Sequence, residues 1–285
     1  MVPTEVVAAD MSDQTRELIQ AVSLDRHGPV RVGAWLAGHR AEVVAAVLAC
    51  DRGGQRRHGT RLAAAVWPAA GLVRDPDWWT ELAEAGEALA IADRDSGALV
   101  DLLHRGATTF AEGGDRLRAE ERWVRALAIT RRDGLSDLGQ AVLRALGDLY
   151  RDWGRLSKAL DAYLGLVDLR QDAGDPAGTA DALASVGATM HAAGRLRSAT
   201  EYFDRADAVL GEVAGAPEAH ARVLVWCGRT RWEQGQHGAA RRRWSQALAM
   251  LVDVDEDAAN EVRELLATEP TYSTNTSSSP SGGVG

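Results

Sequence analysis

Lysine is almost missing from this chain of 285 residues, because Lys158 is the only one. A P-loop holds phosphates with a lysine that follows glycine and precedes serine or threonine, whereas Lys158 follows Ser157. The sequence therefore excludes an ATPase of the P-loop type.

Cysteine is also scarce, and the possible metal ligands lack the spacing of a metal centre. Cys50 and Cys227 lie far apart in apolar helical contexts, so we expect buried thiols and no disulfide. The seven histidines are scattered, and no pair has the helical spacing with an intervening glutamate that zinc sites use. The acids in residues 253–264 resemble a calcium-binding loop, but Ala258 stands where that loop needs glycine to turn. We therefore interpret them as acids at the start of a helix, where they favour its positive end. We expect neither a metal ion nor a cofactor.

Long apolar runs are missing as well. No stretch approaches the roughly 20 apolar residues that span a bilayer, and residues 1–11 carry acids instead of the apolar run of a signal peptide. The formal net charge of −9 argues against attraction to a nucleic-acid backbone. We therefore expect a cytoplasmic protein that binds neither membranes nor nucleic acid.

No arrangement of residues typical of catalysis stands out. The chain has no Gly-x-Ser-x-Gly motif for a serine nucleophile. Carboxylates are so frequent in this acidic sequence that no single pair is informative. We predict no catalytic residue and no enzymatic activity.

What the sequence does contain is a block that recurs about every 40 residues. In each block a glycine stands five residues before an alanine, and an aromatic residue follows that alanine by four. The residues in register are Gly114, Gly154, Gly194 and Gly235; Ala119, Ala159, Ala199 and Ala240; Trp123, Tyr163, Phe203 and Trp244. Only 15 of the 285 residues are aromatic, so chance does not explain four of them in register.

Three further columns precede each glycine at helical spacings of three and four. They are Leu103, Leu143, Leu183 and Leu224; Ala107, Gly147, Gly187 and Gly228; Phe110, Tyr150, Met190 and Arg231. Each block is therefore predicted to form two amphipathic helices, A and B, joined by a turn at the glycine. The small residues mark the place where the two helices approach closely. One such hairpin cannot bury its own apolar face, so neighbouring hairpins must stack.

This pattern resembles the tetratricopeptide repeat. In that family a small residue is followed by a large one and a glycine, and an alanine and an aromatic residue stand on the next helix. The usual unit has roughly 34 residues, and the longer period here is typical of a variant with extended helices. HEAT and armadillo repeats share the period but do not predict this register, and a propeller would need alternation by two. We expect an all-α, right-handed superhelical solenoid of helix-turn-helix repeats.

The same pattern divides the chain into one domain with distinct ends. Residues 1–33 are expected to form a flexible segment with a leading helix. Residues 34–99 are expected to hold a capping helix, from Ala34 to Cys50, and a degenerate first repeat. That repeat has Trp67, Arg74 and Trp79 where later repeats have a small residue, glycine and alanine. Four full repeats and a C-terminal capping helix are expected in residues 100–269, with a disordered tail in residues 270–285.

A narrower resemblance covers nearly the whole chain. Residues 34–47, 62–67 and 244–266, together with Trp79, are similar to the repeat region of actinomycete regulators of the NB-ARC and SARP type. Those proteins place such repeats after an ATPase domain and often a DNA-binding activator domain, neither of which this sequence contains. The resemblance implies a sensor or scaffold and does not extend to direct transcriptional activation.

In the tetratricopeptide family, ligands usually lie in the concave face that the A helices line. By this resemblance we expect a partner-binding surface at seven residues: Arg144, Asp148, Arg151, His191, Arg222, Arg229 and Trp232. Arginine forks on a rigid scaffold suit carboxylates or phosphates of a peptide or helix. Two alternatives stay open: each arginine is paired with a neighbouring acid, or Trp232 packs in the core.

The leading hypothesis is a non-enzymatic scaffold that binds a protein or peptide partner, plausibly in bacterial regulation. One alternative is an accessory protein that senses a small molecule or a signal peptide. The other is an enzyme built on a helical-repeat scaffold, for which the sequence nominates no residues. The family's clamp for C-terminal carboxylates uses lysines and asparagines that this surface lacks, so binding of chaperone tails is not expected.

Overall fold

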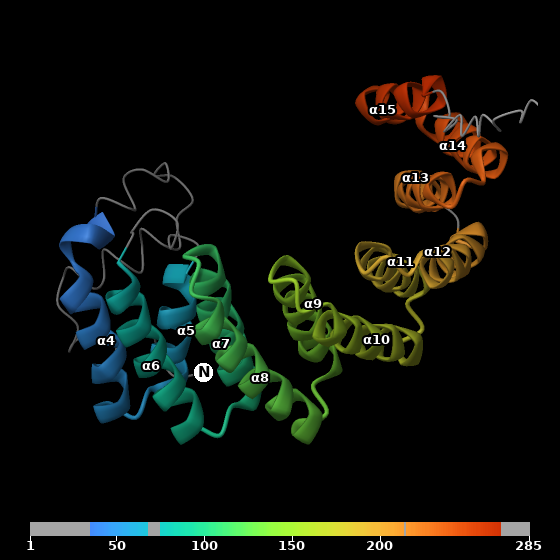
Figure 1. The fold of residues 1–285 in the computed structure, drawn as a ribbon. Coiled ribbons are helices and arrows are strands. Elements are labelled where there is room, and N and C mark those ends of the chain that lie inside the picture. Colours follow the sequence, from blue (N-terminus) through green and yellow to red (C-terminus); the bar gives the residue numbers. More distant parts are fainter. Residues whose placement is uncertain (1–34, 68–74, 214, 269–285) are drawn as a thin grey trace, which may run out of the picture. The chain divides into compact units, whose positions relative to one another are not determined.

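The computed structural model describes residues 35–67, 75–213 and 215–268, and no β-strand occurs in these ranges. The chain is a succession of helices joined by short turns (Figure 1). The helices are α4 (Arg40–Arg52), α5 (Arg56–Val66), α6 (Pro76–Ala92), α7 (Ser96–Glu112), α8 (Arg116–Asp133), α9 (Ser136–Asp152), α10 (Leu156–Asp172), α11 (Pro176–Ala192), α12 (Leu196–Gly211), α13 (Pro217–Glu233), α14 (His237–Leu251) and α15 (Glu256–Ala267).

These helices alternate as the repeat predicts. The A helices of the four full repeats are α7, α9, α11 and α13, and each packs against the B helix that follows it. Helices α5 and α6 form the degenerate hairpin before them, with the Trp67 and Trp79 rings in contact at 5.3 Å. The predicted all-α fold of repeated helix hairpins is confirmed.

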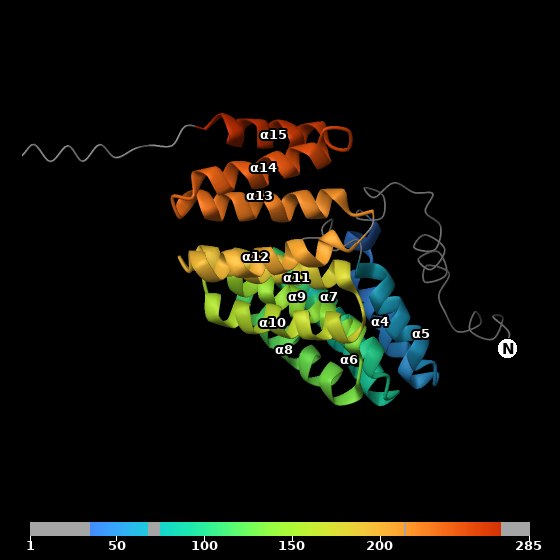
Figure 2. The ribbon, with the colours of Figure 1, turned by 90° about the vertical axis from the view of Figure 1, so that its right-hand side faces the viewer.

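The chain divides into two compact units at the junction of two repeats. Unit 1 ends at Gly174 and contains α4 to α10, whereas unit 2 begins at Asp175 and contains α11 to α15. The boundary lies in the Gly174–Pro176 segment, where Asp175 caps α11 by accepting a hydrogen bond from the Gly178 amide. Within unit 2, the helices from α11 to α15 lie one upon another in chain order (Figure 2).

The small residues of each A helix lie against the aromatic residue of its B helix, as the register predicts. A Cβ added at Gly187 would stand 2.9 Å from the Phe203 ring, and one added at Gly147 or Gly228 would meet the ring of Tyr163 or Trp244 more closely still. Tyr163 and Phe203 are 0% exposed and Trp244 is 2% exposed. These contacts show why the small and aromatic columns occur together in the sequence.

Replacing Gly187 by leucine is expected to overpack this contact and lower the free energy of unfolding by about 1–3 kcal/mol. Gly238→Leu is the matched control, because the nearest atom to a Cβ at that helical glycine is 3.9 Å away. Urea unfolding followed by circular dichroism measures both variants. Equal stabilities would contradict the packing register.

Most of the described turns between helices contain a left-handed residue, about every twenty positions; the turn between α14 and α15 does not. Glycine, which adopts this conformation without steric strain, occupies eight of these described positions: Gly54, Gly114, Gly134, Gly154, Gly174, Gly194, Gly215 and Gly235. Arg94, between α6 and α7, has a φ of 55° and is the non-glycine exception among the described residues. The Cβ of an L-residue makes this conformation unfavourable by about 1 kcal/mol.

Successive B helices within a unit are joined by ion pairs in which the acid lies on the earlier helix and the base on the later one. The pairs are Glu87 with Arg122 and Arg125 (α6 to α8), Glu120 with Arg155 and Lys158 (α8 to α10), and Asp204 and Asp207 with Arg243 (α12 to α14). Stacking of the repeats therefore combines apolar burial with cross-repeat charge pairing.

Glu120 is the best hydrogen-bonded of these acids on the B helices of unit 1. Burial raises the pKa of its carboxyl, but hydrogen bonds from Lys158 and Tyr150 outweigh burial and hold the pKa below its usual value of 4.5. The Lys158 ammonium lies 2.6 Å and the Tyr150 hydroxyl 2.9 Å from Glu120 Oε1. A carboxyl whose pKa falls on folding stabilises the native state above its unfolded pKa, and this stability is lost as the pH drops through the folded pKa.

Glu120→Gln should therefore make the free energy of unfolding fall less steeply as the pH is lowered. We expect the difference in unfolding free energy between the natural chain and the variant to be present at pH about 6 and to shrink toward pH about 3. Glu121→Gln is the control, since Glu121 is exposed and makes no ion pair with a described residue. Parallel pH curves for the natural chain and Glu120→Gln would contradict the assignment.

The N-terminal capping helix departs from the prediction. Residues 35–38 are helical, but the chain leaves helical geometry at His39, whose φ is −123° and ψ 29°, and α4 begins only at Arg40. The His39 ring stacks on the Trp35 ring at 4.2 Å, and its Nδ1 lies 2.8 Å from the Trp35 carbonyl oxygen. The His39 amide still donates to the Trp35 carbonyl oxygen at 3.1 Å, so the break is confined to one residue. The prediction of one unbroken helix from Ala34 to Cys50 is wrong.

Several other predictions concern residues outside the described ranges or concern absences. The flexible segment 1–33, Arg74 and the tail 270–285 lie outside the described residues. Across the described part of the chain, no helix is long and apolar enough to cross a membrane, and no group of His, Cys, Asp and Glu could hold a metal ion. Cys50 and Cys227 are free thiols; Cys227 is buried and Cys50 half-buried.

Candidate functional site

The A-helix side of unit 2 carries a hollow of about 410 Å³ between α13 and α15. We call it the α13–α15 hollow. The residues that line it are Glu218, Arg222, Val225, Trp226 and Arg229 of α13, Leu251 at the end of α14, Asp255 in the following turn, and Ala258, Glu261 and Val262 of α15. Leu251 and Val262 are 4% and 1% exposed, so the floor is apolar while the rim is charged.

Local sequence signals fix the two helices that form the walls. Pro217 stands in the first turn of α13, where its missing N–H is no loss. Asp255 caps α15 by accepting a hydrogen bond from the Ala258 amide at 3.0 Å, and Glu256 and Asp257 follow in the first turn. The prediction that the acids in residues 253–264 belong to a helix start is confirmed.

Trp226 is the exposed aromatic residue of this surface, with 37% of its area accessible. Its ring lies 6.3 Å from the Phe203 ring at an interplanar angle of 10°, and 5.7 Å from the His191 ring at 72°. The Arg229 guanidinium lies 5.4 Å from the same ring. One part of the indole is thus held by neighbours while another faces solvent at the hollow.

The two arginines of the hollow differ in their partners. Arg229 forms an ion pair with Glu261 of α15, which joins the two walls. Arg222 is exposed and forms no ion pair with any residue that the structure describes. A guanidinium offers five donors in a fork that matches a carboxylate or phosphate, so Arg222 is suited to an incoming acidic group.

His191 of α11 extends this surface. Its Nε2 lies 3.2 Å from the Glu233 carboxylate, and its Nδ1 lies 3.1 Å from the Thr230 hydroxyl. The imidazole thereby orients its edge toward the Trp226 ring. His191, Trp226 and Arg229 form a connected aromatic and polar group on α11 and α13.

The sequence-predicted residues of unit 1 form a separate cluster around Tyr163. The Tyr163 hydroxyl donates to Asp148 at 2.6 Å and accepts from Arg151 at 2.9 Å, and Arg151 lies 3.1 Å from Asp148. The Arg144 guanidinium lies 5.9 Å from the Tyr163 ring. Burial, together with the hydrogen bond to Asp148, raises the pKa of Tyr163, so the hydroxyl remains a donor. Arg151 is thus paired with a neighbouring acid, which is the first of the two alternatives that the sequence left open.

Trp232 packs against the core of the last repeat, which is the second alternative that the sequence left open. Its ring packs 5.4 Å from Trp244 and 4.3 Å from His237, beside the core of the last repeat, and it does not line the α13–α15 hollow. The exposed aromatic residue of this surface is Trp226, which is absent from the seven residues that the sequence suggested. A usable signal existed, because Trp226 stands four residues after Arg222 and three before Arg229, on one helix face.

Comparisons with known proteins agree with the fold. No family model matches the sequence, and no curated protein matches it. The structure of BtubC from P. vanneervenii is 18% identical, covers 95% of this chain and 95% of its own, and gives a TM-score of 0.51. A kinesin light chain of Podosopora anserina with nearly identical TPR-like repeats is 15% identical and covers 81% of this chain and 99% of its own, with a TM-score of 0.53.

A third similar structure is a signal transduction ATPase with numerous domains from Pyrococcus horikoshii, which has a tetratricopeptide repeat sensor. It is 11% identical and covers 88% of this chain but 41% of its own, with a TM-score of 0.56. At these identities the likeness concerns the fold, and it gives the chain the helical-repeat architecture of tetratricopeptide proteins.

Proposed function

We propose that this chain is a non-enzymatic scaffold that binds a protein or peptide partner through its A-helix surface. The observation that carries the proposal is the α13–α15 hollow, which combines an exposed tryptophan with an arginine that no described residue neutralises. Tryptophan and arginine are enriched among the residues that contribute most to protein interfaces. Both side chains project from a packed helix, which limits the entropy lost on binding.

The character of the hollow favours a macromolecular partner over a small molecule. Five of its lining residues are charged: Glu218, Arg222, Arg229, Asp255 and Glu261. Small-molecule sites are mostly apolar, with a few convergent polar groups. A charged rim around an apolar floor is instead typical of a protein interface.

The surface that we propose extends beyond the hollow. In unit 2 it includes His191, Arg222, Arg229 and Trp232 of the sequence-predicted residues, and in unit 1 we propose a separate contact surface at Arg144, Asp148 and Arg151. Trp226 and Glu261 are added on the strength of their position in the hollow. Trp232 supports α13 from the core side, and the other residues supply polar contacts.

A role in bacterial regulation from the cytoplasm completes the proposal. It is supported by the sequence resemblance to NB-ARC and SARP-type regulators and by the fold likeness to the Pyrococcus horikoshii ATPase with its tetratricopeptide sensor. Like those repeat regions, this chain would recognise a partner and leave catalysis to other domains or proteins. Sensing of a signal peptide at the same surface is the alternative.

Affinity capture from a lysate of the source organism tests this function. The natural chain is compared with a triple variant, Arg222→Ala with Trp226→Ala and Arg229→Ala, and with a control, Arg197→Ala with Arg242→Ala, on exposed positions of the B helices. We expect a protein that the natural chain and the control retain and the folded triple variant loses. Identical recoveries from all three would contradict the proposed surface.

A further inference from the structure

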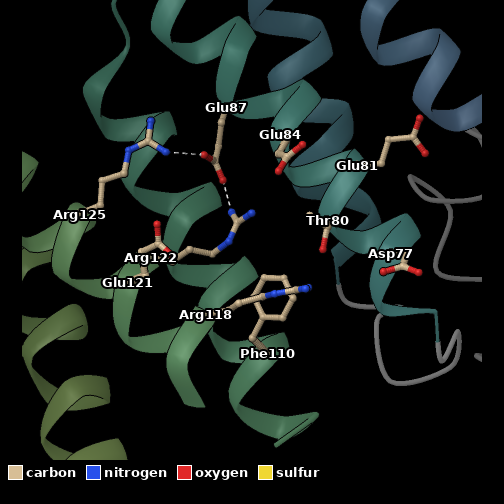
Figure 3. Close-up of a pocket in the computed structure, with 10 residues that line it drawn as sticks. All are labelled: Asp77, Thr80, Glu81, Glu84, Glu87, Phe110, Arg118, Glu121, Arg122 and Arg125. Atoms are coloured by element: carbon tan, nitrogen blue, oxygen red, sulfur yellow. Dashed lines mark hydrogen bonds and ion pairs between the residues drawn. The ribbon is translucent and has the colours of Figure 1, made fainter. Parts of the chain in front are cut away.

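A second surface lies on the B helices of unit 1. Helices α6 and α8 both pack against α7, and the ion pairs of Glu87 with Arg122 and Arg125 join them. Two hollows follow one another between them. The first, of about 530 Å³, lies along residues 77–87 and 118–125 (Figure 3). The second, of about 770 Å³, lies along residues 90–99 and 125–133. The two hollows adjoin at Arg125, which lines both, and we call them together the α6–α8 groove.

An ion pair at the middle of this groove holds its two walls together. Glu87 is 5% exposed, and its carboxylate accepts hydrogen bonds from Arg122 and from Arg125, the latter at 3.0 Å. Figure 3 shows Glu87 reaching from α6 to the two guanidinium groups of α8. The separation of the walls is therefore fixed before any partner arrives, which lowers the ordering cost of binding.

One end of the groove is acidic. Asp77, Glu81 and Glu84 follow one another along α6 at helical spacing, and Glu121 of α8 lines the same hollow (Figure 3). All four are exposed, and none forms an ion pair with a residue that the structure describes. The Phe110 ring, 5% exposed, lies beneath this end and is contacted by the Arg118 guanidinium at 5.4 Å.

The other end is apolar, and its charged lining residues are of both signs: Asp95 and Asp133 stand beside Arg94 and Arg132. Ile91 is 51% exposed beside the buried side chains of Ala90, Leu99 and Ile129. The Arg94 and Arg132 side chains stand around this apolar floor. Arg132 is 68% exposed and pairs with Asp133, whereas Arg94 is exposed and has no ion pair with a described residue.

Arg94 is also the residue with left-handed backbone geometry at a turn position where the rest of the described chain uses glycine. Glycine at this position would remove the strain but also the guanidinium. The chain keeps a charged side chain at the mouth of an apolar hollow in spite of its conformational cost. This second observation, independent of the hollow itself, marks Arg94 at the apolar end of the groove as a place of contact.

We propose that the α6–α8 groove docks an amphipathic helix of a partner protein, with basic residues at one end and an acidic residue beside an aliphatic one at the other. Two parallel helices leave a furrow that accepts a third helix. The acids at one end and Arg94 beside the apolar floor at the other complement such a helix in one orientation. The surface is distinct from the α13–α15 hollow, and this proposal does not depend on the function proposed for it.

Synthetic helical peptides test this docking directly. Residues 77–94 correspond to about 27 Å of helix, so a peptide of about 18 residues spans the groove. The probe carries lysines at one end, leucine and glutamates at the other, and alanine between them. A control peptide has the same composition with the charges interleaved. Fluorescence anisotropy with the full chain should give an affinity for the probe at least about tenfold higher than for the control.

Charge reversal in the groove separates docking from general charge attraction. The double variant Glu81→Lys with Glu84→Lys should not bind the probe. It should bind a second peptide in which glutamates replace the lysines of the probe. Arg222→Ala with Trp226→Ala, in unit 2, should leave probe binding unchanged. Equal affinities for probe and control, no binding of the probe at about 1 mM, or a failed charge reversal in a folded variant would each overturn the proposal.

Arg94→Gly separates the backbone of this residue from its side chain. Glycine should raise the melting temperature, because the left-handed strain disappears, while it weakens probe binding several-fold through loss of the guanidinium. Arg94→Ala is the matched control: it should weaken binding equally without the gain in melting temperature. Unchanged probe binding in both variants would remove Arg94 from the docking surface.

Discussion

Glu87→Ala is expected to lower the free energy of unfolding of unit 1 by about 3–5 kcal/mol. The reason is the buried guanidinium that the substitution leaves behind. The side chains of Glu87 and Arg122 are only 6% and 13% exposed, and Glu87 is the partner of both Arg122 and Arg125. Removing one member of a buried pair leaves a charge in a low-dielectric site without compensation.

Glu84→Ala is the matched control for this prediction. It removes the same carboxylate from the same helix one turn earlier, but Glu84 is exposed and makes no ion pair with a described residue, so its effect should stay within about 0.5 kcal/mol. Urea unfolding followed by circular dichroism measures both. A second comparison, Glu87→Leu with Arg122→Leu, should recover most of the loss, since removing both partners leaves no buried charge. If Glu87→Ala is as stable as the control, the pair does not hold α6 and α8 together.

Trp226→Ala is expected to weaken binding of the captured partner by about 30-fold or more, which corresponds to about 2 kcal/mol or more. Trp226 presents a partly exposed ring to the α13–α15 hollow and is steadied by the Phe203 and His191 rings. A large ring held in place loses little entropy on binding. Trp226→Phe should keep a substantial part of the affinity.

Trp232→Ala provides the contrast. Because the Trp232 ring packs against Trp244 in the core of the last repeat, its loss should lower the melting temperature more than it lowers the affinity of the folded protein. Isothermal titration calorimetry gives the affinities, and thermal unfolding gives the stabilities. If Trp232→Ala lowers the affinity more than Trp226→Ala does, Trp232 and not Trp226 contacts the partner.

The fold could be predicted from the sequence because its determinants are local and repeated. Gly187 must be small because the large Phe203 ring packs against it. The spacing between the two residues is set by the length of one hairpin. The left-handed turns likewise require glycine at fixed intervals. The break at His39 could not be foreseen, because the contacts of its ring with the carbonyl oxygen and ring of Trp35 leave no mark in the repeat pattern.

The candidate site could be predicted only in part. Arg222 and Arg229 share a helix face by simple spacing, and the structure brings both to one hollow. The contribution of Glu261 could not be predicted, since it depends on how the last helix packs against α13. The same holds for the tryptophans. The sequence assigned Trp232 to the binding surface, whereas the neighbours of each ring in the structure leave Trp226 the more exposed one at the hollow.

The charge pairs between B helices were beyond prediction for a similar reason. Glu87 and Arg122 are separated by 35 residues, and many other acids and arginines in this chain have comparable separations. Only the packing of α6 and α8 against α7 selects Glu87 for burial and leaves Glu81 and Glu84 exposed. The acidic end of the α6–α8 groove is a consequence of that selection.

Site-specific photocrosslinking tests the central claim, that the A-helix surface of unit 2 binds a protein partner. Benzoylphenylalanine is placed at position 222, beside the α13–α15 hollow, or at position 242, an exposed position on the B helix α14. Each protein is irradiated in cells of the source organism. We predict a crosslinked partner from position 222 and none from position 242. A partner that crosslinks only from position 242, or no crosslink from position 222 in a folded protein, would contradict the claim.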